Sequence, residues 1–156
     1  MPPPSSVILL VDNDADDIFL FRRALQRAGV EQEIRVLNDG EEAVAYLAGA
    51  GRYADRDAHP LPCLVLLDLK LPKKNGLEVL AWVRAHEEFQ DLPIVMVTSS
   101  DEPRDREEAR RHRVEAYLVK PVEVADLARL AAGIRREAEE HCEDLRPCEP
   151  EEPRAG

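Results

Sequence analysis

The sequence is short of cysteine, of long apolar runs and of basic residues, and each shortage excludes a class of protein. Its three cysteines, Cys63, Cys142 and Cys148, show no CxxC spacing, which argues against a disulfide framework or a zinc site and fits a reducing compartment. No apolar run approaches the ~20 residues of a membrane span. The 21 basic and 32 acidic residues give a net charge of −11, which repels a phosphate backbone. We therefore expect neither a nucleic-acid nor a membrane partner.

The amino end shows no export signal. Its first six residues contain no basic side chain, and the apolar run that follows, residues 7–11, is too short for the core of a signal peptide. The sequence therefore predicts a cytoplasmic protein.

Proline and acidic charge are concentrated at the two ends of a chain that, at 156 residues, has the length of one domain. Residues 137–156 hold eight acids and two arginines, and six of the twelve prolines lie in the first four and last ten residues, where they oppose helix formation. We predict a disordered N-terminus over residues 1–6, one folded domain over 7–141, and an acidic, proline-containing tail over 142–156.

Within the folded part, short apolar runs alternate with amphipathic stretches. The runs span residues 7–11, 33–37, 63–67, 93–97 and 116–119, and helical patterns span 14–28, about 38–48, 76–86, 105–112 and 124–140, with a longer loop at 49–62. Five successive βα units predict an α/β fold with an open, doubly wound sheet of five parallel strands. Ligands of such sheets bind at the carboxyl ends of the strands.

Chemically useful residues follow four of these predicted strands, namely Asp12-Asn13-Asp14, Asp68, Thr98 and Lys120. Each of them alone is most often a turn or helix cap. Together they place carboxylates, a hydroxyl and an amine at one edge of the sheet, where oxygen ligands suit Mg²⁺. An aspartate beside such a metal can be the nucleophile in phosphoryl transfer, which mainly requires positioning and charge neutralisation.

Four segments carry the motifs of one known family. They are Val-Asp-Asn-Asp at 11–14, Leu-Leu-Asp-Leu-Lys-Leu-Pro-Lys-Lys-Asn-Gly at 66–76, Val-Thr-Ser-Ser at 97–100 and Tyr-Leu-Val-Lys-Pro at 117–121. These segments resemble the receiver domain of two-component response regulators, and the resemblance covers about residues 7–140. It implies the flavodoxin-like (βα)5 sheet with strand order 2-1-3-4-5.

The resemblance also implies roles for individual residues. Asp68 matches the phosphoacceptor, Thr98 the hydroxyl that moves toward the phosphoryl group, and Lys120 the cation that pairs with it. Tyr117 matches the aromatic switch residue, and the Lys120–Pro121 peptide bond is expected to be cis.

The implied ligands of Mg²⁺ or Mn²⁺ are Asp12, Asn13, Asp68 and the backbone carbonyl of Lys70. In the family the second ligand is normally an acid, so Asn13 is a departure that removes one charge and predicts weaker metal binding. Asp14 could replace it after a shift of one residue, but it would then point into the start of the next helix. The in-register assignment is therefore the prediction.

The long loop at 49–62, the Leu-Pro-Lys-Lys-Asn-Gly segment and the end of the last predicted helix resemble stand-alone regulators paired with phytochrome histidine kinases. Three of the four lysines follow Asp68 directly, namely Lys70, Lys73 and Lys74, whereas the chain has seventeen arginines. The expected function is that of a single-domain response regulator that accepts a phosphoryl group on Asp68 from such a kinase.

Two other functions stay open. The first is a phosphatase or phosphotransferase with an aspartate nucleophile, which would typically need a second acid two residues later, where this chain has Lys70. The second is an interaction module that is poorly phosphorylated, which only Asn13 supports. We expect no enzymatic activity other than autophosphorylation and autodephosphorylation.

A homodimer through the fourth helix, fifth strand and fifth helix is the expected assembly, because the family commonly uses this surface. Five arginines lie at 104, 106, 110, 111 and 113 and are expected to pair with acids of a partner copy. The last helix is expected to add apolar positions, namely Leu127, Leu130, Ala131 and Ile134.

Overall fold

Five short apolar strands form the centre of the structure, a computed structural model that describes residues 7–130 and 132. They are β1 (Val7–Val11), β2 (Glu33–Leu37), β3 (Leu64–Leu67), β4 (Ile94–Thr98) and β5 (Ala116–Val119). All neighbouring strands pair in parallel, in the order β2-β1-β3-β4-β5. This order confirms the predicted flavodoxin-like fold.

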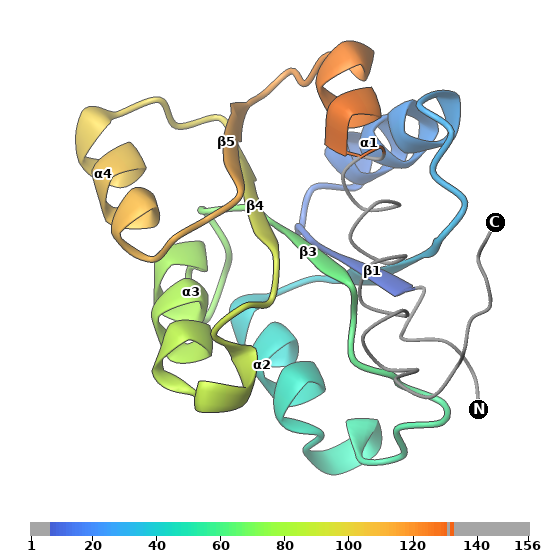
Figure 1. The fold of residues 1–156 in the computed structure, drawn as a ribbon, viewed down its shortest axis with the longest axis vertical. Helices are drawn as coiled ribbons and strands as arrows, with labels where there is room; N and C mark the ends of the chain where they lie inside the picture. Colours follow the sequence, from blue (N-terminus) through green and yellow to red (C-terminus); the bar gives the residue numbers. More distant parts are fainter. Residues whose placement is uncertain (1–6, 131, 133–156) are drawn as a thin grey trace, which may run out of the picture.

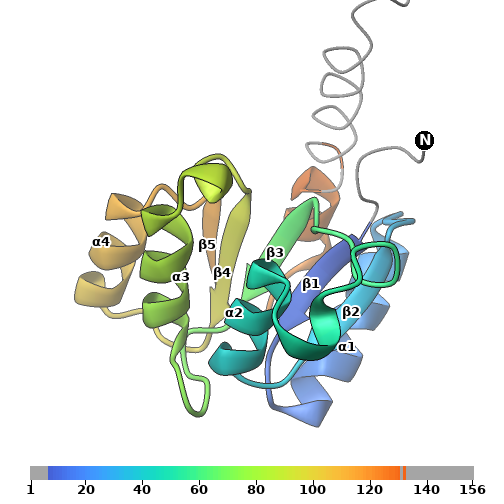
Figure 2. The same ribbon diagram turned by 90° about the horizontal axis from the view of Figure 1, so that it is seen from below.

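Helices cover both faces of this sheet. They are α1 (Ala15–Arg27), α2 (Gly40–Ala48), α3 (Gly76–Ala85) and α4 (Pro103–Arg111), with 3₁₀ turns η1 (Gly51–Tyr53) and η2 (Glu87–Phe89) and a helical segment over 124–130. Helices α2, α3 and α4 pack on one face, while α1 and the segment 124–130 pack on the other (Figures 1 and 2).

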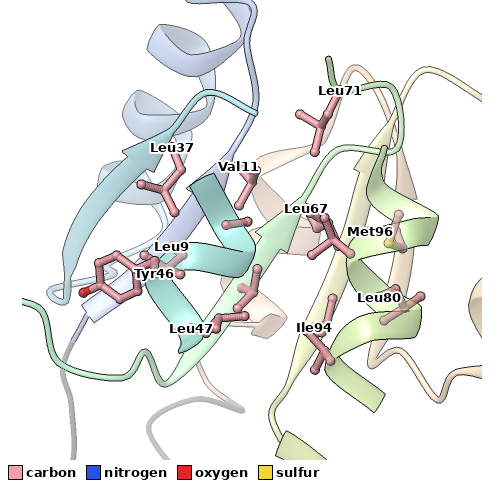
Figure 3. Packing of buried hydrophobic residues seen from close by; sticks show 14 of the residues in the cluster. Leu9, Val11, Leu37, Tyr46, Leu47, Leu67, Leu71, Leu80, Ile94 and Met96 are labelled. Carbon is pink, nitrogen blue, oxygen red and sulfur yellow. The ribbon is translucent and has the colours of Figure 1, made fainter. Parts of the chain in front are cut away.

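The two faces receive alternate residues of the central strands, as the period of two in a β-strand requires. In β1, Leu9 and Val11 point toward α2 and α3, whereas Ile8 and Leu10 point toward α1. Figure 3 shows the first of these clusters, in which Leu80 of α3 packs beside strand β4. Burial on both faces explains why the strands are uniformly apolar.

Polar caps start three of the helices close to the carboxyl edge of the sheet. The Asp14 carboxylate accepts from the backbone of the first turn of α1, and Asp39 does the same for α2. Asn75 and Glu78 form a capping box on α3. These caps fix the points at which the chain leaves the edge that carries the site.

A buried arginine joins several segments at the opposite edge, where the strands begin. The Arg84 guanidinium donates to five backbone carbonyl oxygens, those of His112 (2.7 Å), Phe89 (2.9 Å), Gln90 (3.2 Å), Leu92 (2.9 Å) and Arg113 (3.1 Å). Within the described residues it forms no salt bridge, and burial lowers its pKa. The ends of α3 and α4 and the start of β4 are thereby held together.

The structure shifts a few predicted boundaries. The helix predicted at 105–112 begins at Pro103, because proline suits the first position of a helix. The loop at 49–62 contains η1, and Arg56 binds it to the end of α2 through the carbonyl oxygens of Tyr46 and Leu47. The terminal predictions for residues 1–6 and 142–156 lie outside the described residues. In the described residues, no helix is both long and apolar enough to span a bilayer.

Candidate functional site

Three strand ends bring Asp12, Asp68 and Lys120 together. The sheet pairing continues one residue past each strand, since the amides of Asp12, Asp68 and Lys120 donate to the carbonyl oxygens of Leu37, Val11 and Thr98 at 2.9–3.0 Å. Asp12 is 2% exposed and Asp68 8% exposed, so both carboxylates lie at the floor of the edge. The backbone therefore places these side chains with little freedom.

The Lys120 ammonium group is the centre of this site. Its Nζ donates to Asp12 Oδ2 at 2.9 Å, to Asp17 Oδ2 at 2.8 Å and to Asp68 Oδ2 at 3.1 Å. Burial lowers the pKa of Lys120, but the bonds to Asp17 and Asp12 and the charge of Asp68 outweigh burial and leave the pKa well above its ordinary value. Burial also raises the pKa of Asp12, against the effect of Lys120.

Asp17 is the residue that sequence reasoning missed. Acids are favourable in the first turn of any helix, so Asp16 and Asp17 at the start of α1 do not by themselves indicate a site. Side chains of a helix lean toward its N-terminus, and α1 starts at the carboxyl edge, so an acid in this turn reaches back to the site. The sequence pattern alone does not distinguish Asp17 from the neighbouring Asp16, so it contains no signal for this contact.

Asn13 and Asp14 behave differently from each other. Asp14 is committed to capping α1, since its Oδ1 accepts from the backbone N–H groups of Asp16 and Asp17 at 2.9 and 3.1 Å. The structure therefore gives no support to the shifted assignment. Asn13 is exposed beside Asp12, and in the described part of the chain its side-chain amide takes part in no hydrogen bond.

The oxygen donors at this edge fit a hard divalent cation. The carbonyl oxygen of Lys70 accepts no hydrogen bond from any described residue, while the Lys70 N–H donates to Asp68 Oδ1 at 3.3 Å. Between residues 7 and 130, no three His, Cys, Asp or Glu side chains are arranged to hold a metal by themselves. A cation here would therefore also depend on Asn13, on the Lys70 carbonyl and on water.

The loop after Asp68 is held close to the site by glycines. A Cβ atom on Gly76 would lie 2.3 Å from the carbonyl oxygen of Asp68, and one on Gly40 would lie 1.7 Å from that of Lys74. Lys73 has a φ of 69° in this turn, and its Nζ lies 3.7 Å from Asp39 Oδ2. A side chain at Gly76 would displace the backbone of Asp68, and one at Gly40 would displace the backbone of Lys74 in the loop that follows.

Thr98 ends β4 and is fully buried. Its Oγ1 accepts from the backbone N–H of Ser100 at 3.3 Å, and it forms no hydrogen bond with Asp68 in this structure. The hydroxyl is therefore on the same edge as Asp68 but is engaged with the β4–α4 loop.

Tyr117 on β5 contacts the same loop. Its hydroxyl donates to the carbonyl oxygen of Ser100 at 2.9 Å, and the Arg106 guanidinium lies over its ring at 4.8 Å from the centroid. The Ser100 hydroxyl in turn donates to Asp105 Oδ2 at 2.6 Å. Burial raises the pKa of Tyr117. The Lys120–Pro121 bond is cis, as expected.

Two observations concern the surface that was predicted to form a dimer. Four of its arginines form ion pairs with acids of their own segment, namely Arg104 with Glu102, Arg106 with Asp101, Arg110 with Glu107 and Arg111 with Glu108. Leu127 is fully buried in the core beside α1, so its assignment to the surface was wrong. Leu130 packs against the same core, while Ala131 and Ile134 lie outside the described residues.

The chain is similar in sequence and in fold to known proteins. A family model for the response regulator receiver domain matches residues 8–132. The chain is 36% identical over 131 residues to Response regulator Rcp1 of Synechocystis sp., a match covering 84% of this chain and 87% of Rcp1. The structure of the phosphorylated cyanobacterial phytochrome response regulator RcpA has a TM-score of 0.72 and 33% identity, covering 88% of this chain and 96% of RcpA. The Mn²⁺-bound form of Rcp1 has a TM-score of 0.69 and 36% identity, covering 83% of this chain and 91% of Rcp1.

Proposed function

Because this chain belongs to the response regulator receiver family and is related to phytochrome response regulators, we propose that Asp68 accepts a phosphoryl group from a histidine kinase. The observation that carries the proposal is the buried Asp68 carboxylate, which shares the Lys120 ammonium with two other acids at the carboxyl edge. A phosphoryl group has the charge and the acceptor oxygens that such an ammonium binds.

The covalent step is a transfer between two side chains. An Asp68 carboxylate oxygen attacks the phosphorus of a phosphohistidine, a new O–P bond forms, the N–P bond breaks, and the imidazole nitrogen keeps the electron pair. Lys120 neutralises charge on the phosphoryl oxygens. Thr98 leaves Ser100 to donate its hydroxyl to the same group, which changes the β4–α4 loop that Tyr117 contacts.

We further propose Mg²⁺ as the cofactor, held by Asp12, Asn13, Asp68 and the carbonyl of Lys70. When bound, a divalent cation offsets negative charge between Asp68 and the incoming phosphoryl group. The related Rcp1 has been described in a Mn²⁺-bound form, which supports a divalent cation for this family. Asn13 supplies an oxygen without a charge, so its contribution is weaker than that of an acid.

Phosphorylation of the purified protein tests the proposal. Incubation with a small acyl phosphate and Mg²⁺ should add one phosphoryl mass, and peptide mapping should place it on Asp68. Asp68→Asn should abolish the added mass, whereas Asp91→Asn, a change of the same kind at an exposed and distant acid, should retain it. Labelling of Asp68→Asn to the wild-type level would contradict the proposal, and no labelling of the wild-type protein would favour an interaction module.

A phosphotransferase or phosphatase is the alternative that the site supports less well. The position two residues after Asp68 is Lys70, whose side chain cannot donate a proton in the way a carboxylic acid does, and it is exposed. Multiple turnover of a phosphate ester by the wild-type protein would favour this alternative.

The kinase that we propose is of the phytochrome type, on the basis of the related proteins. Phosphohistidine transfer from purified kinases to Asp68 should be fastest from kinases that carry a chromophore-binding domain. Equal rates from kinases without that domain would contradict this pairing.

We also propose a homodimer through α4, β5 and the helical segment after residue 123. The local ion pairs of Arg110 and Arg111 leave each arginine with free N–H donors for acids of a second copy. Arg110→Glu with Arg111→Glu should lower the mass measured by light scattering toward that of a monomer. Arg22→Glu with Arg23→Glu, exposed on α1, is the control and should leave the mass unchanged. A wild-type monomer at high concentration, with and without phosphodonor, would contradict the dimer.

A further inference from the structure

The three N–H donors of Lys120 are fully used in this structure. Each one is directed to a different carboxylate, at 2.9 Å for Asp12, 2.8 Å for Asp17 and 3.1 Å for Asp68. An ammonium group has no fourth donor. For Lys120 to bind an oxygen of a phosphoryl group on Asp68, one of these carboxylates must therefore lose its bond.

The three carboxylates differ in what they would lose. The Asp12 side chain is 3% exposed and that of Asp68 is 10% exposed, whereas that of Asp17 is 37% exposed. A buried carboxylate without a partner is strongly unfavourable, while a carboxylate at the surface is solvated by water. Release of Asp17 is therefore the least unfavourable of the three.

Asp17 also has no second function for its carboxylate in the described part of the chain, because that carboxylate contacts Lys120 alone. Asp12 is held by a further bond, since its Oδ1 accepts from the N–H of Asp14 at 3.0 Å. Asp68 is itself the group to be modified. Only Asp17 among the three can leave Lys120 without disturbing another contact of the site.

We propose that Asp17 is a positioning residue that holds Lys120 while Asp68 is unmodified and releases it when a phosphoryl group arrives. This inference rests on the proposed function of Asp68. Asp17 lies in the first turn of α1, so its release from Lys120 couples that turn to the state of Asp68. Asp17 acts through Lys120 and does not itself touch the phosphorus.

Removal of the Asp17 charge should shift two binding constants in opposite directions. A phosphoryl analogue on Asp68 should bind more tightly, because it no longer competes with Asp17 for Lys120. Mg²⁺ alone should bind more weakly, because the edge has lost a negative charge and Lys120 pairs more fully with Asp12 and Asp68. A variant that is merely less well folded would weaken both.

The experiment compares Asp17→Asn with Asp16→Asn. Asp16 is the preceding acid, it is exposed, and its carboxylate makes no bond in the described residues, so the control has the same change in net charge. Calorimetry measures Mg²⁺ alone, and fluorine NMR measures beryllofluoride at saturating Mg²⁺. Relative to Asp16→Asn, we expect Asp17→Asn to bind beryllofluoride about two- to fivefold more tightly and Mg²⁺ more weakly by a similar factor.

Asp17→Glu, which retains a carboxylate, should restore both constants toward the wild-type values. If the wild-type protein binds beryllofluoride but Asp17→Asn and Asp16→Asn have equal binding constants, the proposed role of Asp17 is wrong while the proposed function of Asp68 stands. The same conclusion follows if Asp17→Asn shifts the constants for beryllofluoride and Mg²⁺ in one direction. If the wild-type protein binds Mg²⁺ but no beryllofluoride, the proposed function of Asp68 fails and this inference fails with it.

Discussion

The two edges of the sheet each contain a cation, the half-buried Lys120 at one and the buried Arg84 at the other, and the partners of these cations differ in kind. At the carboxyl edge, Lys120 binds three carboxylates. At the amino edge, Arg84 binds five backbone carbonyl oxygens, from η2, from the segment between η2 and β4, and from the residues that follow α4. One cation is thus held by charges on side chains and the other by dipoles of the backbone.

This difference gives the two networks different capacities for rearrangement. A carboxylate on a side chain can rotate away, be solvated or be replaced by a phosphoryl oxygen, so the Lys120 network can rearrange when a ligand binds. A backbone carbonyl moves only if the chain around it moves, so the Arg84 network resists rearrangement. The comparison predicts that substitutions at Arg84 change stability, and that substitutions around Lys120 mainly change the response to ligands.

The largest effect is expected at Arg84. Arg84→Met keeps much of the volume but leaves five carbonyl oxygens without their donor, and one of them, that of Phe89, is buried. We expect the free energy of unfolding to fall by about 3 kcal/mol. Urea denaturation measures this loss, and Arg22→Met, at an exposed arginine of α1, should change stability by less than about 0.5 kcal/mol. Equal losses in the two variants would remove the distinction between the edges.

A smaller effect is expected for Lys120→Met at pH 7. Three carboxylates would remain close together without a cation, and two of them are buried, but solvent at the edge reduces the penalty. We expect a loss of about 1–2 kcal/mol, together with loss of the response of Thr98 and Tyr117 to beryllofluoride.

The pH dependence of that loss has a definite sign. Burial already raises the pKa of Asp12, and removal of Lys120 raises it further. An acid whose pKa is raised on folding binds protons more readily in the native state, so its unfavourable contribution disappears as the pH falls. The stability difference between Lys120→Met and wild type should therefore narrow from pH 7 toward pH 5. A difference that widens toward low pH would contradict the assignment.

The sheet and its functional edge could be predicted because they depend on local pattern. Uniformly apolar runs indicate strands covered on both faces, and βα alternation makes them parallel. Once the strands are parallel, the residues that follow them must meet at one edge, which is how Asp12, Asp68, Thr98 and Lys120 were identified. The structure places these four residues at the same edge of the sheet, as predicted. Their roles in phosphoryl transfer stay predictions.

Three features depend on contacts that no local pattern contains. Asp17 reaches Lys120 across 103 positions of the chain, and Arg84 reaches the carbonyl oxygen of Arg113 across 29. A polar side chain on a helix meets a distant partner only after the helices have packed, so the sequence alone does not indicate which partner it will have. Leu127 shows the same limit for an apolar residue. An apolar position on a helix is suited equally to a core and to an interface, so the sequence pattern does not decide between them.

The smallest effect on stability is expected for Asn13→Asp. This substitution adds a negative charge to the carboxyl edge of the sheet and so tests how that edge differs from the amino edge. Without a divalent cation, a fourth acid near Asp12, Asp17 and Asp68 should lower the free energy of unfolding by about 0.5 kcal/mol through repulsion. With Mg²⁺, the added charge should tighten binding by about three- to tenfold, and a ligand that binds only the native state raises its stability. The order of stability of Asn13→Asp and wild type should thus reverse as Mg²⁺ is added, which urea denaturation at a series of Mg²⁺ concentrations measures. Gln26→Glu, the same amide-to-acid change on the exposed side of α1, should show no reversal, and unchanged Mg²⁺ affinity in Asn13→Asp would indicate that water or another oxygen already serves at this position.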